Sequence, residues 1–566
     1  MRTAARAVDT FDVVVVGSGF GGAVTTYRQA QAGRSVCLLE RGRAYPPGSF
    51  PRRPSEVSRS LWDPSEGLHG LFDVWSFRRL DALVASGLGG GSLIYANVLL
   101  RKDEHWFNRD LPDGGYESWP VSRADLDPAY DRVEAMLTPT PYPDVFSAAN
   151  PKAAALARAA GRTGMAYQRL PLAVTFGERD RVGVTFDDGS ANYHHVPRQS
   201  CHSCGACNLG CNAGSKNTLD MTYLSRADTR HADIRPGAEV RSFRPVAGGW
   251  EVSYVDRVEV APTPGTVQDR TGAAGSGATG DPDEPRREHR VRCRQLVLSA
   301  GALGTTFLLL RNRAALPRIS DRLGRAFSGN GDFLGFFTQA PERLDPSVGP
   351  VITGAVRVPD HADGGDGPGM YLEDGGYHEL LDWLNELLPP VDLGRRVARL
   401  TRARLSQALR GPGPTRISRE VAQLVGDAHQ STGRLPLLAM GRDCPDSRLE
   451  LRDGLLDLDS GRGSAAYYRT VEDRLRALAG ALGARYRPGV TARLSRMITV
   501  HPLGGAAMAR SARDGVVDRH GEVFGHPGLF VVDGAMMPGP VGANPSLTIA
   551  AMAELCSDAM LERVAA

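Results

Sequence analysis

Residues 11–40 read FDVVVVGSGFGGAVTTYRQAQAGRSVCLLE, and this stretch decides the fold of the chain. The apolar, β-branched run from Phe11 to Val16 is typical of a parallel strand that is buried on both faces. A glycine-rich turn follows it directly, then a helical pattern over Ala23 to Ala32 and a second strand from Ser35 to Glu40. The order of strand, turn, helix and strand predicts a βαβ unit at the start of a parallel sheet.

The turn has the glycine spacing of a dinucleotide-binding site, Gly17-x-Gly19-x-x-Gly22. Gly17 allows the tight turn, Gly19 lets the backbone approach a pyrophosphate, and Gly22 lets helix and strand pack closely. The pyrophosphate then meets unpaired N–H groups at the positive end of the helix. Glu40 ends the second strand, where its carboxylate can accept hydrogen bonds from an adenosine ribose and would repel a 2′-phosphate. We therefore expect FAD or NAD, rather than NADP, in a Rossmann-type domain.

Length and composition exclude few classes of protein. The chain has 566 residues, of which 42% are hydrophobic and 23% charged, and its net charge is +3. A chain of this length is longer than a single hydrophobic core usually supports, so we expect two domains that share a cleft. The small net charge does not favour nucleic acid as a partner. Without a signal-peptide pattern, or the run of about 18 apolar residues that a membrane span needs, we expect a soluble, cytoplasmic protein.

Two later segments repeat the pattern of strand, turn and helix. Gln295 to Ser299 is strand-like and leads into a helical pattern over Thr306 to Asn312. Near the end of the chain, Leu529 to Val532 leads through a loop into a helix from about Pro545 to Glu562. We therefore expect the nucleotide-binding domain to be assembled from pieces that are far apart in the sequence.

Motifs along the whole chain resemble those of the glucose-methanol-choline (GMC) oxidoreductases, and within them the bacterial cholesterol-oxidase-like branch. The last motif is the most specific, because His501, Asp533-Gly534 and Asn544-Pro545 appear in the family's order and spacing. The segment from Val351 to Val490 matches weakly. The matching blocks are Val14 to Arg41, Ala85 to Asn97, Gly214 to Asp220, Leu323 to Gly331, and His501 to Glu554.

The resemblance implies an α/β fold in which a Rossmann-type FAD-binding domain is interleaved with a sheet-based, α+β substrate-binding domain. It also implies FAD, rather than NAD, as the cofactor. The predicted FAD-binding domain covers residues 1–110, 200–335 and 490–566. The predicted substrate-binding domain covers residues 111–199 and 336–489, and residues 257–290, rich in Gly, Pro, Thr and charge, are expected to form a flexible hairpin insertion.

The resemblance also implies where FAD is bound. In such enzymes the segment like Gly89 to Asn97 runs past the pyrophosphate and the flavin ring, and the segment like Ala238 to Val240 supports the adenine. Residues like Asp533 and Gly534 touch the ribityl chain. The predicted FAD-binding residues are therefore Gly17, Gly19, Gly22, Glu40, Gly90, Gly91, Ser92, Asn97, Val240, Asp533 and Gly534.

Two residues are the predicted catalytic pair. Alcohol oxidation needs a base for the hydroxyl proton as the hydride moves to flavin N5, and neutral imidazole suits this work near pH 7. The resemblance identifies His501 as that base, although a turn histidine with a structural hydrogen bond would fit the local pattern. Asn544 matches the polar residue that faces the same substrate oxygen. Locally, Asn544 is also typical of a helix N-cap, with Pro545 at the first helical position.

Cholesterol-oxidase-like enzymes also hold a carboxylate in the substrate domain that moves a proton during double-bond isomerisation. Glu373, in Met370 to Gly375, is the nearest match in this sequence. The match is loose, and the local pattern favours an exposed turn. We therefore assign Glu373 no role from the sequence.

Four of the eight cysteines lie within eleven positions, with the spacing Cys201-x2-Cys204-x2-Cys207-x3-Cys211. This spacing predicts an iron–sulfur cluster, although no proline follows Cys211 and the fourth cysteine of such runs can bind a different cluster. Structural zinc, or thiols that are uncoordinated or paired as disulfides, are the alternatives. A cluster would offer an exit for electrons from reduced FAD and would make the enzyme a dehydrogenase rather than an oxidase.

The segments 378–388 and 393–410 place leucines on one helical face beside several arginines. Such a pattern could rest weakly on an anionic membrane surface, but ordinary packing of helices in the substrate-binding domain explains it too and is the favoured interpretation.

The sequence thus predicts an FAD-dependent oxidoreductase that removes a hydride from the CH–OH group of a bulky apolar alcohol, sterol-like or polycyclic. Its expected partners are that small molecule and an external electron acceptor. A flavoenzyme that carries out desaturation or redox tailoring of a natural product is an alternative. An electron-transfer flavoprotein without its own substrate is another, but it would need neither His501 nor Asn544.

Overall fold

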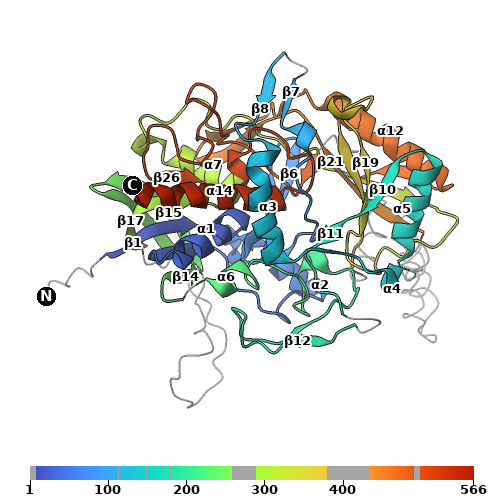
Figure 1. Cartoon of the computed structure of the whole chain (residues 1–566), viewed down its shortest axis with the longest axis horizontal. Coiled ribbons are helices and arrows are strands. Elements are labelled where there is room, and N and C mark those ends of the chain that lie inside the picture. Colours follow the sequence, from blue (N-terminus) through green and yellow to red (C-terminus); the bar gives the residue numbers. More distant parts are fainter. Residues whose placement is uncertain are drawn as a thin grey trace, which may run out of the picture.

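The structure is a computed structural model that describes residues 8–111, 114–147, 150–177, 182–227, 229–257, 288–378, 433–489 and 497–565. The predicted hairpin at 257–290 lies outside the described residues except at its two edges, and so do the two leucine- and arginine-rich segments except for His378. Figure 1 shows the described elements arranged around two sheets, a seven-stranded sheet on the left and a six-stranded sheet on the right.

The seven-stranded sheet begins with the predicted βαβ unit. Strand β1 (Asp9–Val16) pairs in parallel with β2 (Val36–Glu40), and helix α1 (Phe20–Gln31) connects them. The side chains from Val13 to Val16 are all buried, as expected for a parallel strand covered on both faces. The strand order is β14-β2-β1-β17-β16-β15, and β26 also pairs with β17. The predicted α/β fold class is therefore confirmed.

Strand β17 (Glu288–Leu298) joins parts of the chain that are far apart in the sequence. It pairs in parallel with β1 and with β26 (Leu529–Val531), and antiparallel with β16 (Gly249–Asp256). Strands β14 (Ala232–Pro236) and β15 (Ala238–Val246) lie at the two edges of the sheet. The expectation that this domain is built from separated pieces agrees with these pairings.

The helices that follow these strands were also expected. Helix α7 (Gly301–Arg311) follows β17, and α14 (Ser546–Ala565) follows the loop after β26. Helix α14 packs against α1 and α3 (Arg123–Leu137), and Figure 1 shows these three helices beside the seven-stranded sheet.

The second sheet has six antiparallel strands in the order β10-β19-β20-β21-β18-β24. Helices α5 (Pro151–Arg162) and α12 (Ala465–Ala481) pack against it and share one apolar core with its strands, as Figure 1 shows on the right. The strands of this sheet are β10 (Ala166–Arg169), β18 (Phe333–Thr338), β19 (Gly354–Val358), β20 (Met370–Asp374), β21 (Leu435–Gly441) and β24 (Arg485–Pro488).

The residue boundaries expected for the two domains stay a prediction.

Shorter elements connect the two sheets. The three-stranded sheet β25-β6-β5 is the one that leads to His501, because β25 (Met497–Thr499) ends just before it. The other strands are β3 (Trp62–Asp63), β4 (Leu68–His69), β5 (Phe72–Ser76), β6 (Leu80–Ala85), β7 (Asn108–Asp110), β8 (Tyr116–Ser118), β9 (Thr140–Pro141), β11 (Pro171–Leu172), β12 (Thr185–Asp187), β13 (Arg198–Gln199), β22 (Arg448–Arg452) and β23 (Leu455–Asp459). The other helices are α2 (Pro54–Arg59), α4 (Asp144–Ser147) and α6 (Tyr223–Arg226).

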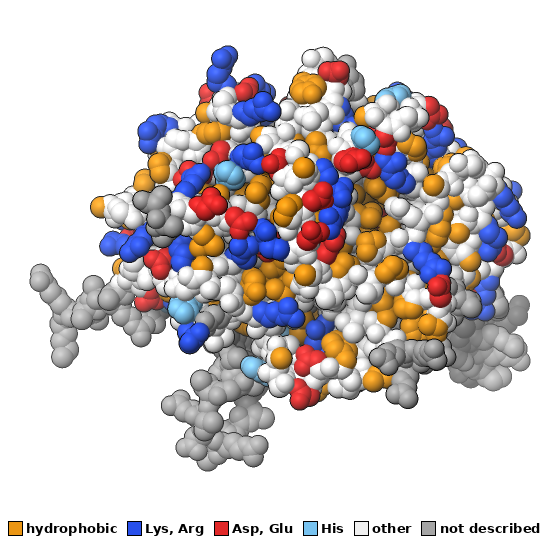
Figure 2. Space-filling view, viewed as in Figure 1, with side chains coloured by type: hydrophobic (Ala, Val, Ile, Leu, Met, Phe, Trp, Pro, Cys, Tyr) orange, Lys and Arg blue, Asp and Glu red, His pale blue; other side chains and the backbone are white. Residues whose placement is uncertain are grey.

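The surface carries charges of both signs. Figure 2 shows acidic and basic side chains interspersed over the face in view, in keeping with the small net charge of +3. Among the described residues, no helix is both long enough and apolar enough to span a membrane.

Candidate active site

The glycine turn between β1 and α1 makes contacts that exclude larger residues. A Cβ atom on Gly17, whose φ is +95°, would lie 2.3 Å from the carbonyl oxygen of Ser299. A Cβ atom on Gly22 would lie 1.9 Å from the carbonyl oxygen of Gly17. Gly19 differs, because no heavy atom lies within 4 Å of its Cβ position. The backbone at Gly19 therefore borders open space at the N-terminus of α1, where unpaired N–H groups can bind a pyrophosphate.

Glu40 links this turn to the segment Gly89–Asn97. Its Oε2 accepts hydrogen bonds from the Ser18 N–H at 3.0 Å and the Ser18 hydroxyl at 2.6 Å, and its Oε1 accepts one from the Gly42 N–H at 2.8 Å. The Ser18 hydroxyl oxygen accepts a bond from the Gly89 N–H at 2.9 Å. Burial raises the pKa of Glu40, and the bonds from Ser18 and Gly42 oppose that rise.

The segment Gly89–Asn97 lies against the turn. A Cβ atom on Gly90 would lie 2.7 Å from Gly19 Cα, whereas the Cβ position of Gly91 has no heavy atom within 4 Å. The Ser92 hydroxyl is engaged within the protein, since it donates to the Gly89 carbonyl at 2.7 Å and accepts from the Leu219 N–H at 3.0 Å.

Asn97 is the unusual residue of this segment. It is fully buried with φ of +72°, and neither side-chain polar atom has a hydrogen-bond partner among the described residues. A buried amide without a partner is costly, so its presence indicates a bound group that supplies the missing bonds.

Asp533 and Gly534 follow β26. The Asp533 carboxylate accepts hydrogen bonds from the Thr305 hydroxyl at 2.5 Å, the Gly301 N–H at 2.9 Å and the Ala535 N–H at 2.8 Å. Burial raises the pKa of Asp533 to about 6. Its side chain therefore holds the loop after β26 against the start of α7 and has three protein donors already.

Val240, predicted to lie near the adenine, is buried in β15. The turn before this strand contacts the end of β2, because the Gly237 N–H donates to the Gly42 carbonyl at 3.0 Å. The residues around the turn fit FAD in two respects. Space is open at Gly19 and Gly91, and the Asn97 amide has no partner in the described part of the chain.

His501 lies on the loop after β25, and its side chain is 16% exposed. Its Nδ1 is 2.8 Å from Asp332 Oδ1, whereas Asp332 Oδ2 accepts hydrogen bonds from the Val500 N–H at 2.8 Å and the Thr499 hydroxyl at 2.9 Å. A carboxylate at Nδ1 keeps the proton on that nitrogen and leaves the Nε2 lone pair free. No described residue forms a hydrogen bond with Nε2, so this nitrogen can accept a proton from a substrate.

Asn544 is buried just before α14, and its Oδ1 has no hydrogen-bond partner among the described residues. The prediction that this oxygen caps the helix is wrong. Helix α14 begins at Ser546, and the Asn544 Oδ1 accepts no hydrogen bond from the N–H groups of its first turn. The Asn544 side chain instead faces Glu373.

Glu373 lies in the interior of the six-stranded sheet, so the expectation of an exposed turn is also wrong. It pairs with Ala355 of β19 and Leu438 of β21, and none of its surface is exposed. Neither carboxyl oxygen has a hydrogen-bond partner among the described residues. Burial raises the pKa of Glu373 well above its usual range, against the effect of the Asn544 amide, and thus favours the protonated form.

Four separate segments thus bring a histidine, an amide and two carboxyl groups to one place. The sequence predicted His501 and Asn544 but missed Asp332, because the motif recognised there ended at Gly331, one residue short. It noticed Glu373 but misjudged its burial. The combination is an imidazole held by a carboxylate at one nitrogen, a buried amide and a second, buried carboxyl group.

Comparisons with known proteins point to one group of enzymes. The family model for GMC oxidoreductases matches residues 470–553, which include His501 and Asn544. A cholesterol oxidase of Acinetobacter baumannii is 28% identical over 96% of this chain and 93% of its own length. The chain is therefore similar to the GMC oxidoreductases, which are FAD-binding flavoproteins that act on CH–OH donors.

Two further similarities support the assignment of the whole chain to the GMC fold. Paromamine 6′-oxidase of Streptomyces fradiae is 25% identical over 96% of this chain and 90% of its own length. The crystal structure of pyridoxine 4-oxidase from Mesorbium loti superposes with a TM-score of 0.54 at 15% identity, covering 97% of this chain and 99% of that one. At that identity the superposition establishes the fold alone.

The cysteine loop, residues 201–211, lies entirely within the described residues. Cys204 is exposed and the other three cysteines of the loop are partly buried, and all eight cysteines of the chain are free of disulfides. Across the described residues, no group of three or more Cys, His, Asp or Glu side chains is placed to hold a metal ion. The arrangement of the four thiols therefore gives no support to the predicted iron–sulfur cluster or to the alternative zinc ion.

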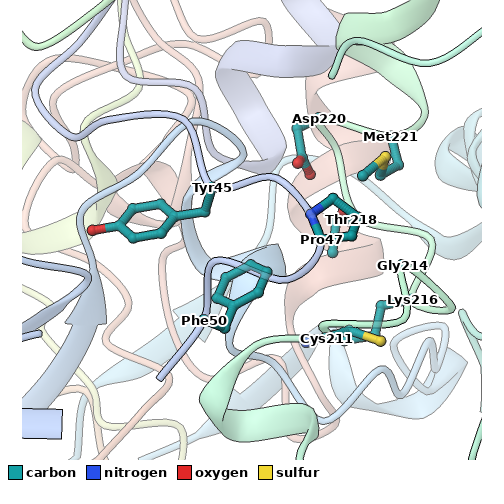
Figure 3. A pocket seen from close by; sticks show the side chains of 9 residues that line it. All are labelled: Tyr45, Pro47, Phe50, Cys211, Gly214, Lys216, Thr218, Asp220 and Met221. Atoms are coloured by element: carbon teal, nitrogen blue, oxygen red, sulfur yellow. The ribbon is translucent and has the colours of Figure 1, made fainter. Parts of the chain in front are cut away.

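Lys216 ties the cysteine loop to the segment that borders the cofactor site. Its buried ammonium group donates to the carbonyl oxygens of Leu93 at 3.0 Å, Tyr95 at 2.9 Å and Cys207 at 3.0 Å. Burial lowers the pKa of Lys216 to about 8. Figure 3 shows a small pocket beside this lysine, with Cys211 on one side and the aromatic ring of Phe50 on another.

Proposed function

We propose that this protein removes a hydride from the CH–OH carbon of a bulky apolar alcohol, sterol-like or polycyclic, with His501 as the base. The observation that carries this proposal is the 2.8 Å contact between His501 Nδ1 and Asp332, which leaves Nε2 without a partner among the described residues. An imidazole held in this tautomer accepts a hydroxyl proton through Nε2.

Each side chain then has a defined task. His501 Nε2 takes the hydroxyl proton, and Asp332 stabilises the imidazolium that forms. The Asn544 amide, buried beside Glu373, donates a hydrogen bond to the substrate oxygen as it becomes a carbonyl. Bound FAD supplies the hydride acceptor.

We further propose that FAD is held at the glycine turn and the adjoining segments. Gly19 and Gly91 border the open space, and the Asn97 amide supplies hydrogen bonds that nothing else in the described chain takes up. Ser92 and Asp533 act indirectly, because protein groups already occupy their side chains. The remaining proposed contacts are Gly17, Gly22, Glu40, Gly90, Val240 and Gly534.

A second step is open to an unsaturated substrate. Once the alcohol is a ketone, a carboxylate can take the proton from the carbon between the carbonyl and a neighbouring double bond and return it at the far end of that bond. The buried Glu373 carboxyl, without a partner among the described residues, suits this work, since a raised pKa makes its ionised form a stronger base. This step would move the double bond into conjugation without any further oxidant.

The substrate class rests on two supports. The nearly full-length similarity to a cholesterol oxidase favours a sterol-like alcohol, and so does the buried Glu373 carboxyl, which suits the second step. The similarity to paromamine 6′-oxidase favours the alternative, the tailoring of a natural product at a CH–OH group. A pure electron-transfer flavoprotein is disfavoured, because the His501–Asp332 pair would have no use in it.

We propose no path for electrons through the cysteine loop, because no described group of side chains is placed to hold a metal ion. Oxygen or an external acceptor would then take the electrons. Cytoplasmic location and weak membrane contact stay predictions.

The test is anaerobic mixing of the FAD-loaded enzyme with a panel of alcohols while the flavin absorbance is followed. A 3β-hydroxysterol, a long-chain primary alcohol and paromamine represent the three substrate classes. We expect the sterol to bleach the flavin fastest. Bleaching by paromamine alone would establish the natural-product alternative, and no bleaching by any alcohol, with bleaching by an external reductant, would overturn the proposal.

A further inference from the structure

The segment Asn330–Asp332, which leads into β18, touches the loops of both proposed catalytic residues. We propose that this 330–332 segment is a single positioning element that sets the distance between His501 and Asn544. The inference rests on the proposed function, since it concerns how the catalytic pair is held. The Asp332 side chain contacts the His501 ring directly. The Asn330 side chain instead holds the backbone just before Asn544.

Asp332 holds the histidine at more than one point. Its Oδ1 faces the His501 ring at 2.8 Å, and its Oδ2 accepts hydrogen bonds from the Val500 N–H at 2.8 Å and the His501 N–H at 3.2 Å. The Thr499 hydroxyl adds a bond at 2.9 Å. One buried carboxylate therefore fixes both the backbone of this loop and the orientation of its imidazole.

Asn330 holds the other loop in a similar way. Its side-chain oxygen accepts a hydrogen bond from the Gly542 N–H at 2.9 Å, and its side-chain nitrogen donates to the Ala543 carbonyl at 2.9 Å. Ala543 directly precedes Asn544. Because Asn330 is fully buried, no water competes for these two bonds, and they fix the peptide from which the Asn544 side chain starts.

The 330–332 segment is itself attached to the six-stranded sheet. The Asn330 carbonyl accepts from the Gly441 N–H at 3.0 Å, and the Gly331 carbonyl accepts from the Tyr467 hydroxyl at 2.9 Å. Asn330 adopts a left-handed conformation with φ of +57°, which turns its side chain and that of Asp332 toward different loops. His501 and Asn544 thus take their relative position from one anchored point.

Asn330 is a positioning residue in this arrangement, because it acts only through Asn544. Loss of its side chain should let residues 540–544 move while the His501–Asp332 pair stays in place. A misplaced amide no longer meets the substrate oxygen as the carbonyl forms, so flavin reduction should slow by about 10- to 100-fold with little change in substrate affinity.

The chain offers a matched control in Asn312, at the C-terminus of α7. This buried asparagine also accepts from a backbone N–H, that of Phe243 at 3.2 Å, and donates to a backbone carbonyl, that of Leu308 at 2.8 Å. Asn312→Ala should also lower the melting temperature, though by less than Asn330→Ala, whose left-handed backbone disfavours alanine, and should leave the rate of flavin reduction unchanged.

The experiment combines two measurements on the FAD-loaded enzyme. Hydrogen–deuterium exchange should rise in peptides that cover residues 540–546 in Asn330→Ala and should not rise there in Asn312→Ala. In a double-mutant cycle, Asn330→Ala should cost little further rate once Asn544 is alanine, because both changes remove the same interaction. Should the alanine variant not fold, Asn330→Gly removes both bonds while keeping the left-handed backbone conformation, and the same exchange is expected.

The outcomes separate this inference from the proposed function. Unchanged exchange at 540–546, or full additivity of the two substitutions, would overturn the positioning role. Increased exchange at 540–546 together with unimpaired flavin reduction in His501→Ala would refute the proposed base but leave the positioning of the loop established.

Discussion

His501 Nδ1 and Asp332 Oδ1 lie 2.8 Å apart, although 169 residues separate them in the sequence. The carboxylate fixes the imidazole tautomer that can accept a proton at Nε2. Because this tautomer depends on the contact, substitution of either residue should slow flavin reduction.

Asp332→Asn should slow flavin reduction by about 10² to 10⁴, the usual contribution of a positioned base. An amide can donate to Nδ1 as well as accept from it, so the ring would no longer be held with its lone pair at Nε2. Anaerobic stopped-flow measurement of flavin reduction checks this. His501→Ala should lose a similar factor, and the double variant should lose no more than either single one. Bound FAD and the melting temperature provide the control, and independent, multiplying effects would contradict the pairing.

Glu373→Gln should separate the two proposed chemical steps. The amide keeps the size of the carboxyl group but cannot take up and return a proton, so hydride removal should continue within a few-fold while double-bond migration stops. The substrate is a sterol in which one carbon separates the alcohol carbon from a double bond. The measurement is the ratio of unconjugated to conjugated ketone in the products. His501→Ala should show the opposite pattern, with slow oxidation and an unchanged product ratio. A conjugated product from Glu373→Gln would place the proton transfer elsewhere.

The sequence was most informative where a structure depends on neighbours along the chain. The βαβ unit could be predicted because an unbroken apolar run and three glycines define it within Phe11–Glu40. Glu373 was misjudged because its burial comes from β19 and β21, strands that no local pattern connects to it. Asp332 and His501 are brought together only by the tertiary fold, which the sequence alone does not reveal.

The cysteine loop is the clearest case in which spacing suggested more than the arrangement supports. We expect freshly purified protein, kept from oxygen, to hold no stoichiometric iron, acid-labile sulfide or zinc, because the described thiols are not placed to share a metal. Elemental analysis and titration with a thiol reagent check this. Cys204 is exposed and should react first, and Cys204→Ser should remove the fastest phase. Cys201 is partly buried and should react more slowly than Cys204, although burial raises the pKa of both thiols. Iron and sulfide in near-integral amounts would restore the predicted cluster.

Asp443 gives a prediction about stability and pH. It is buried beside the 330–332 segment and accepts a hydrogen bond from the Ser328 hydroxyl at 2.5 Å. Burial raises the pKa of Asp443 to about 7, and the nearby Asp332 adds to the rise. The folded protein therefore binds this proton more tightly than the unfolded chain does, so the contribution to stability is complete below about pH 4 and is lost as the pH rises through about 7.

Asp443→Asn should remove this dependence, because the amide stays neutral and can still accept the bond from Ser328. The free energy of unfolding of the native protein should fall, through this one group, by at most roughly 1.4 kcal/mol per pH unit between about pH 4 and pH 7. The variant should therefore gain melting temperature relative to the native protein as the pH rises from 5 to 8. Melting curves of both FAD-loaded proteins at several pH values measure that difference. A constant gap in melting temperature from pH 5 to pH 8 would mean that Asp443 keeps the same protonation state on folding.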